Sequence, residues 1–196
     1  LYIARYAELI AASERGKPDI RPPFGFNRII APKRYDSEIV NMLGVKYILS
    51  FDDLPRARYR KVFEEGRTKI YENSHVFPRA FLVKDISYVV SKNQVIEKFF
   101  DGTKLQDHAF TDDPAFREFV KSKKMTITGG EASITSYSEN TIIIRTVVSG
   151  EGFLILTDPY YPTWKAKLVR QDGTEENLQV FRTNYLFRGI FVPKGE

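Results

Sequence analysis

The chain has 196 residues, of which 42% are hydrophobic, and this size suits one large folded domain or two small ones. It contains no cysteine, which excludes disulfides, thiolate metal sites and cysteine nucleophiles, and its two histidines lack the spacing of a metal motif. The net charge of +5 arises from basic residues dispersed among 25 acidic ones, so we expect no nucleic-acid partner.

Residues 1–44 predict a helical and looped segment that packs on a sheet. Apolar side chains recur three and four positions apart in residues 1–15 and stop at Gly16-Lys17-Pro18, which favours a helix. The proline-rich residues 19–32 predict an irregular loop, and residues 35–43 predict a second, short helix.

Residues 45–123 predict strands with a helical insertion. Strands are expected at 45–50, 59–63, 68–71 and 79–86, and the four residues between the second and third force an antiparallel hairpin. The hydrophobic period then lengthens from two towards 3.6, which predicts a helix over 94–100 and another that begins at Asp113-Pro114.

Residues 124–196 predict only strands, at 125–128, 132–138 and 141–148, followed by a β-meander over 153–196. Residues 141–148 are β-branched apart from Arg145, which predicts a central strand covered on both faces. Lys124 marks the one composition shift, and hence the one subdomain border. The expected fold is α+β: an antiparallel β-sandwich, jelly-roll-like or carbohydrate-binding-module-like, with two to four short helices, completed by 124–196.

The common catalytic motifs are missing. The sequence contains no GxSxG, GxGxxG, GxxxxGK or HExxH, and its paired carboxylates are adjacent residues in predicted turns, loops or helix starts. We interpret His75 and His108 as ordinary surface or hydrogen-bonded histidines. The sequence therefore predicts no catalytic residue, no metal site and no cofactor.

Aromatic and arginine side chains gather in the last meander. Trp164, the only tryptophan, and its tyrosine neighbours offer a flat platform for sugar rings, while arginine and asparagine can bond hydroxyls or a phosphate. The candidate ligand-binding residues are Tyr160, Tyr161, Trp164, Arg182, Asn184, Tyr185 and Arg188. Alternatively, Trp164 and the tyrosines pack inside the sandwich with their polar tips bonded at its corner.

Several runs together resemble a known family. They are VKYIL (45–49), KIYEN (69–73), Pro78-Arg79-Ala80, ITSYSEN (134–140), DPYYPTWKA (158–166) and NYLFRGIFVPKG (184–195). In this order they resemble the C-terminal extracytoplasmic region of YfhO-type bacterial membrane proteins, which are related to the GT-C class of membrane glycosyltransferases. Thr163 stands where that family often has glycine, and residues 1–40 match only loosely.

The resemblance implies a function for the chain. It implies an accessory domain on the extracytoplasmic face of the bacterial cell membrane, whose partners are the transmembrane region of its own full-length protein and a glycan or lipid-linked sugar. The parent protein would be glycosyltransferase-like, with its catalytic acids near N-terminal membrane spans. Since the chain lacks an initiating methionine and a long apolar run, we expect it to be an excised part of that protein.

Two other hypotheses come from different classes. The first is a structural or assembly module that braces the membrane spans without a ligand, which an exposed apolar patch would favour. The second is an autonomous hydrolase, which requires two convergent carboxylates or a Ser-His pair near His75 or His108.

Overall fold

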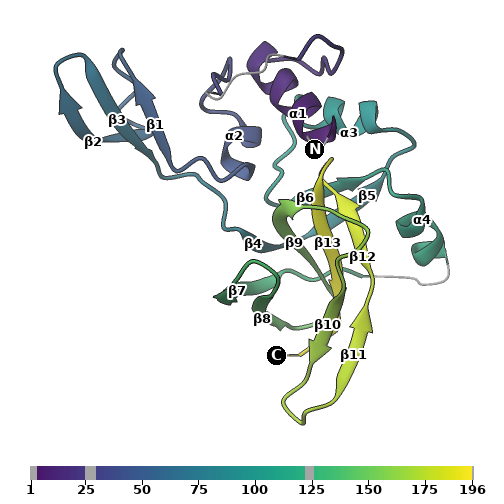
Figure 1. Ribbon diagram of the computed structural model, residues 1–196. Helices are drawn as coiled ribbons and strands as arrows, with labels where there is room; N and C mark the ends of the chain where they lie inside the picture. Colours follow the sequence, from purple (N-terminus) through teal and green to yellow (C-terminus); the bar gives the residue numbers. More distant parts are fainter. Residues whose placement is uncertain (1–3, 25–29, 122–125, 196) are drawn as a thin grey trace.

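The computed structural model shows an α+β chain of mostly antiparallel sheets with four short helices among its described residues, which are 4–24, 30–121 and 126–195 (Figure 1). The helices are α1 (Ala4–Arg15), α2 (Glu38–Met42), α3 (Lys92–Lys98) and α4 (Pro114–Lys121). The strands are β1 (Tyr47–Ser50), β2 (Tyr59–Glu65), β3 (Thr68–Asn73), β4 (Ala80–Val83), β5 (Asp85–Tyr88), β6 (His108–Thr111), β7 (Gly130–Tyr137), β8 (Ile142–Val148), β9 (Gly152–Pro159), β10 (Ala166–Val169), β11 (Glu175–Leu178), β12 (Val180–Thr183) and β13 (Phe187–Val192).

A four-stranded antiparallel sheet in the order β12-β13-β9-β4 forms the centre of the fold. Successive side chains of a strand point to opposite faces, so Phe153 and Ile155 of β9 face one layer and Leu154 and Leu156 face the other. The first layer is the main core, to which α1, α3 and α4 contribute apolar side chains. The second is a smaller cluster that includes isoleucines of the β7–β8 hairpin. Both faces of this sheet are therefore buried.

A three-stranded antiparallel sheet in the order β1-β3-β2 forms a lobe that projects from the rest of the chain beyond α2 (Figure 1). Ile48, Tyr59 and Tyr71 bury their side chains on one face and make a separate small core. Tyr47 and Leu49, which alternate with Ile48, are more than half exposed. The lobe thus has one buried face and one open face.

Several predicted elements are confirmed. The hairpin of β2 and β3 is antiparallel, and the predicted helices over 35–43, 94–100 and after Asp113 correspond to α2, α3 and α4. The predicted helix over 1–15 corresponds to α1 from residue 4 onwards, and residues 19–24 and 30–32 of the predicted loop contain no helix or strand. Residues 1–3 and 25–29 of these two predictions lie outside the described residues. Residue Met125 of the predicted strand over 125–128 lies outside the described residues. The described part of that segment makes only an isolated bridge, from Ile127 to Glu151.

Other predicted elements are wrong. The strand over 79–86 is two strands, because the chain leaves the central sheet after Val83 and β5 pairs in parallel with β6, a strand the sequence did not predict. Residues 141–148 do not form a central strand. Among the described strands β8 pairs only with β7, apart from an isolated bridge from Val148 to Gly195, and Ile143 and Val147 of its outer face are exposed. The last strands are not a simple meander, since β10 and β11 pair apart while β9 lies between β13 and β4.

Candidate functional site

Trp164 and Arg188 form a stacked pair at the end of the central sheet. The guanidinium carbon of Arg188 lies 3.8 Å from the centroid of the Trp164 ring. Arg188 belongs to β13 and is 7% exposed, and its Nε donates a hydrogen bond of 3.0 Å to the carbonyl of Pro159. Trp164 remains partly exposed, so it is not the core tryptophan of the alternative interpretation. The guanidinium group of Arg188 instead covers one face of the indole ring.

Asp158 joins a second arginine and a tyrosine to this pair. Its Oδ1 lies 2.5 Å from Nη1 of Arg79, and its Oδ2 accepts a hydrogen bond of 2.9 Å from the hydroxyl of Tyr137. The guanidinium of Arg79 also lies 5.5 Å from the centre of the Tyr137 ring. Asp158 is buried, while Tyr137 and the Arg79 side chain are about half exposed. The carboxylate therefore orients two side chains that reach the surface.

Burial shifts the pKa values of two side chains of this group. Burial lowers the pKa of the Arg188 guanidinium, and the nearby charges of Asp158 and Tyr137 oppose that shift. Burial also raises the pKa of Tyr137, and its hydrogen bond to Asp158 raises it further. Because Tyr137 is neutral at pH 7, the two arginines and one carboxylate leave a net charge of about +1.

We call this group the Trp164 surface. It consists of Arg79, Tyr137, Asp158, Tyr161, Trp164 and Arg188. Tyr161 is 46% exposed and begins the turn that carries Trp164, whose backbone N–H donates to the Tyr161 carbonyl at 3.1 Å. The rings of Tyr137, Tyr161 and Trp164 and the side chain of Arg79 thus reach solvent, and nearly buried Arg188 lies against Trp164.

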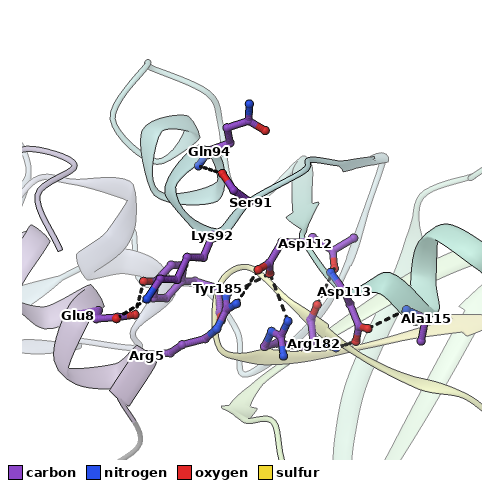
Figure 2. Close-up of polar contacts among 11 residues, drawn as sticks. Arg5, Glu8, Ser91, Lys92, Gln94, Asp112, Asp113, Ala115, Arg182 and Tyr185 are labelled. Atoms are coloured by element: carbon purple, nitrogen blue, oxygen red, sulfur yellow. Dashed lines mark hydrogen bonds and ion pairs between the residues drawn. The ribbon is translucent and has the colours of Figure 1, made fainter. Parts of the chain in front are cut away.

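The other predicted ligand residues belong to a different contact group. Arg182 lies 3.6 Å from Asp112, and its backbone N–H donates to Asp113 (Figure 2). Tyr160 is partly buried; burial raises its pKa, with Asp113 adding to the shift and Arg182 opposing it. These two side chains therefore face the acidic start of α4 rather than Arg188.

Asn184 and Tyr185, which were also predicted as ligand contacts, are buried rather than exposed. Asn184 is fully buried: its backbone N–H and its Oδ1 bond the carbonyl and the N–H of Phe110. Tyr185 is 1% exposed, and its hydroxyl donates to Glu8 at 2.5 Å (Figure 2). Both have positive φ, 45° and 75°, in the turn between β12 and β13. These residues anchor that turn to β6 and α1.

The sequence interpretation missed Arg79, Tyr137 and Asp158. Arg79 and Tyr137 are 79 and 21 positions from Asp158, and no local pattern connects residues that far apart. The run DPYYPTWKA contains Asp158, but its sequence does not indicate that the carboxylate is buried and bonded twice.

Two Ser-His pairs occur in the part of the chain that the structure describes. Ser87 Oγ lies 2.9 Å from His108 Nε2, and Asp85 Oδ2 lies 3.3 Å from His108 Nδ1. Ser74 Oγ lies 3.2 Å from His75 Nδ1 on an exposed loop. The hydrolase hypothesis required such a pair, so it stays open.

Two kinds of feature are absent from the described residues. No cluster of three or more His, Asp or Glu side chains among them could hold a metal ion. No helix in the described ranges is both long enough and apolar enough to cross a membrane.

Comparison of the chain with protein-family profiles, with curated protein sequences and with solved structures gave no match.

Proposed function

We propose that this chain is an extracytoplasmic accessory domain of a polytopic membrane protein that resembles cell-envelope glycosyltransferases, and that it binds a glycan at the Trp164 surface. The observation that carries the proposal is the stacking of partly exposed Trp164 on nearly buried Arg188. A ring fixed from one side offers its remaining exposed surface without losing rotamer freedom on binding.

Polar groups around the ring support the same ligand class. Sugars combine apolar C–H faces with hydroxyls, and the surface combines Tyr161 and Trp164 with the guanidinium groups of Arg79 and Arg188. Arg188 donates to protein only through Nε among the described contacts, which leaves its terminal nitrogens for a ligand oxygen. A lipid-linked sugar or a polymer acceptor fits this chemistry.

We also infer that the chain is a β-sandwich, because the β7–β8 hairpin packs over the central sheet. The β7–β8 hairpin contributes Ile134, Ile142 and Ile144 to the layer over Leu154 and Leu156. A second antiparallel unit over a central sheet supports a β-sandwich arrangement.

Tryptophan fluorescence tests glycan binding directly. Trp164 is the only tryptophan, so the emission of the wild-type protein reports on this surface alone. Titration with envelope glycans should shift the emission and saturate, and isothermal titration should give the same affinity. Trp164→Ala should weaken the calorimetric affinity by at least tenfold while circular dichroism stays unchanged.

A matched control lies on the other exposed aromatic region. Tyr47→Ala in β1 removes a more exposed ring and should leave the affinity unchanged. Saturable binding that survives Trp164→Ala, or the absence of a fluorescence change with any envelope glycan, would contradict the proposal. If Trp164→Ala unfolds the protein, Trp164→Phe, which keeps a ring over Arg188, gives the comparison instead.

The second candidate is the structural module, and the open face of the β1–β3 lobe favours it. Tyr47, Leu49, Phe51 and Phe63 are each between 46% and 61% exposed. The register places Leu49 beside Ile70 and Ile70 beside Phe63, which makes an apolar row across all three strands. Under this candidate the row packs against the transmembrane region of the full-length protein. Replacing Leu49 and Phe63 by serine would loosen that contact, and limited proteolysis would then cleave the domain faster in the full-length protein.

A further inference from the structure

The parallel pair β5–β6 brings a serine, a histidine and an aspartate to one face. Asp85 and Ser87 are two positions apart in β5, so their side chains point to the same side of the strand. The register sets Asp85 opposite His108 and Ser87 opposite Phe110. His108 therefore lies opposite Asp85 and two residues before the partner of Ser87, so its imidazole can reach both β5 side chains.

Three contacts fix the imidazole of His108. Its Nε2 lies 2.9 Å from Ser87 Oγ, and its Nδ1 lies 3.3 Å from Asp85 Oδ2. Its ring stacks on Phe110, with centroids 4.5 Å apart and planes 21° apart, and Phe110 is itself buried. The other oxygen of Asp85 accepts a hydrogen bond of 2.8 Å from the backbone N–H of Ile86. The carboxylate is thus oriented as well as the ring.

The carboxylate decides where the proton of the neutral imidazole lies. An ionised carboxylate only accepts hydrogen bonds, so Asp85 favours the tautomer with the proton on Nδ1. Nε2 then carries the lone pair and accepts from the hydroxyl of Ser87. A nucleophile bonded to a base, which a third group orients, is the arrangement that activates serine for attack.

We propose that Ser87, His108 and Asp85 form a nucleophilic site that hydrolyses activated esters. Ser87 Oγ attacks the ester carbonyl while its proton moves to His108 Nε2, and the C–O bond to the leaving alcohol breaks as that proton passes to the alcohol. Water then attacks the acyl-serine, gives a proton to Nε2, and releases the carboxylic acid while Ser87 Oγ regains its proton. This activity is independent of glycan binding at the Trp164 surface.

The environment sets the substrate class and the expected rate. The His108 side chain is 28% exposed, so a substrate can reach it, and that of Asp85 is 63% exposed, so water screens its charge. Among the described contacts, Ser87 Oγ bonds only His108, so no other partner competes for the hydroxyl. Esters with good leaving groups need the least stabilisation of the oxyanion that forms on the substrate, so they are the expected substrates, rather than amides.

A fluorophosphonate probe tests the site on the whole chain. The probe should label Ser87, with a Ser–O–P bond formed and fluoride released, and peptide mass mapping should locate the adduct. Ser87→Ala should abolish the label. His108→Gln keeps a polar side chain but removes the base, and should slow labelling by about 100-fold. Asp85→Asn should slow it by roughly tenfold, because the screened carboxylate orients the ring without being buried.

The chain contains its own matched control. Ser74 and His75 make a similar contact of 3.2 Å, but through Nδ1, and no carboxylate contacts His75 among the described ion pairs. Ser74→Ala should therefore leave labelling and the hydrolysis of p-nitrophenyl acetate unchanged. The proposal is overturned if Ser87 in the wild-type protein takes no label, if Ser74 is labelled at the same rate, or if folded His108→Gln protein is labelled as fast as wild type.

Discussion

The central sheet and the β1–β3 lobe use the same strand chemistry with opposite outcomes. In β9, Leu154 and Ile155 are neighbours on opposite faces and both are buried. In β1, the neighbours Ile48 and Leu49 are 5% and 61% exposed. The sheet has a layer on each side, whereas the lobe covers only one of its faces. Apolar alternation therefore does not reveal whether an apolar side chain has a partner.

The exposed aromatic rings of the two regions also have different neighbouring side chains. On the Trp164 surface, rings lie against arginines and a buried carboxylate. On the lobe, the row of Leu49, Ile70 and Phe63 is apolar, although Lys46 and Arg67 lie over the neighbouring rings of Tyr47 and Phe51. A surface with oriented donors suits a polar ligand with an apolar face, while a purely apolar row suits another apolar surface.

The largest effects are expected in the central sheet. Leu154→Ala and Ile155→Ala should each lower the free energy of unfolding by about 2–5 kcal/mol, because each leaves a cavity in a packed layer. Guanidinium denaturation of the two variants gives the values. A loss confined to Ile155→Ala would mean that the β7–β8 layer does not cover the second face.

The corresponding pair in the lobe should behave unequally. Ile48→Ala removes a buried side chain and should cost roughly 2 kcal/mol or more, whereas Leu49→Ala should change the free energy of unfolding by less than about 0.5 kcal/mol. The same denaturation experiment measures both. Equal losses would show that the open face is covered in solution.

Asp158→Ala tests the buried carboxylate of the Trp164 surface. It leaves Arg79 and Tyr137 without their acceptor and removes the negative charge nearest Arg188, so we expect a loss of about 1–3 kcal/mol. Asp158→Asn, which keeps an acceptor oxygen for Tyr137, should lose less. If both variants match wild type in thermal unfolding, the carboxylate does not organise this surface.

The smallest effects depend on pH and separate the two regions. The hydrogen bonds from Lys69 and Tyr71 hold the pKa of Asp53 in the lobe below its ordinary 3.8, so its contribution is present above that value and is lost as pH falls below it. The pKa of Tyr137 is raised above its ordinary 10.0, chiefly by burial, so its contribution is present below that value and is lost as pH rises through it.

Variant pairs measure these two contributions. The stability difference between wild type and Asp53→Asn should shrink in acid, and the difference between wild type and Tyr137→Phe should shrink above pH 10. Denaturation at pH 3, 7 and 10.5 provides both comparisons. A difference that is constant across the three pH values would rule out the corresponding contact.

Local patterns predicted most elements but few of their neighbours. The periods of two and 3.6 located the helices and most strands. They did not predict β6, because His108–Thr111 is a four-residue strand paired in parallel with β5, and nothing in its own sequence reports that pairing. The branched run of β8 suggested cover on both faces, but cover depends on which sheet the strand joins.

In the candidate site, too, residue types were predicted but long-range contacts were not. Trp164 and Arg188 were predicted from their types and do lie together. Tyr185 and Asn184 had the same composition signal, but Glu8 and Phe110 bury them through contacts 177 and 74 positions away in the chain. Residue type predicted what a side chain can do, and distant partners determined whether it was free to do it.

The bond between Tyr185 and Glu8 has a consequence for biosynthesis. Helix α1 buries Leu9 and Ala12 in the main core, and that core also needs Phe181, Phe187 and Phe191. At about 5–20 residues per second, the 177 positions between Glu8 and Tyr185 take roughly 10–35 seconds to translate. During this time the apolar face of α1 has no docking partner at the β12–β13 turn. Helix α1 is thus synthesised well before its partners at the β12–β13 turn, and it is a segment that a holding chaperone would protect.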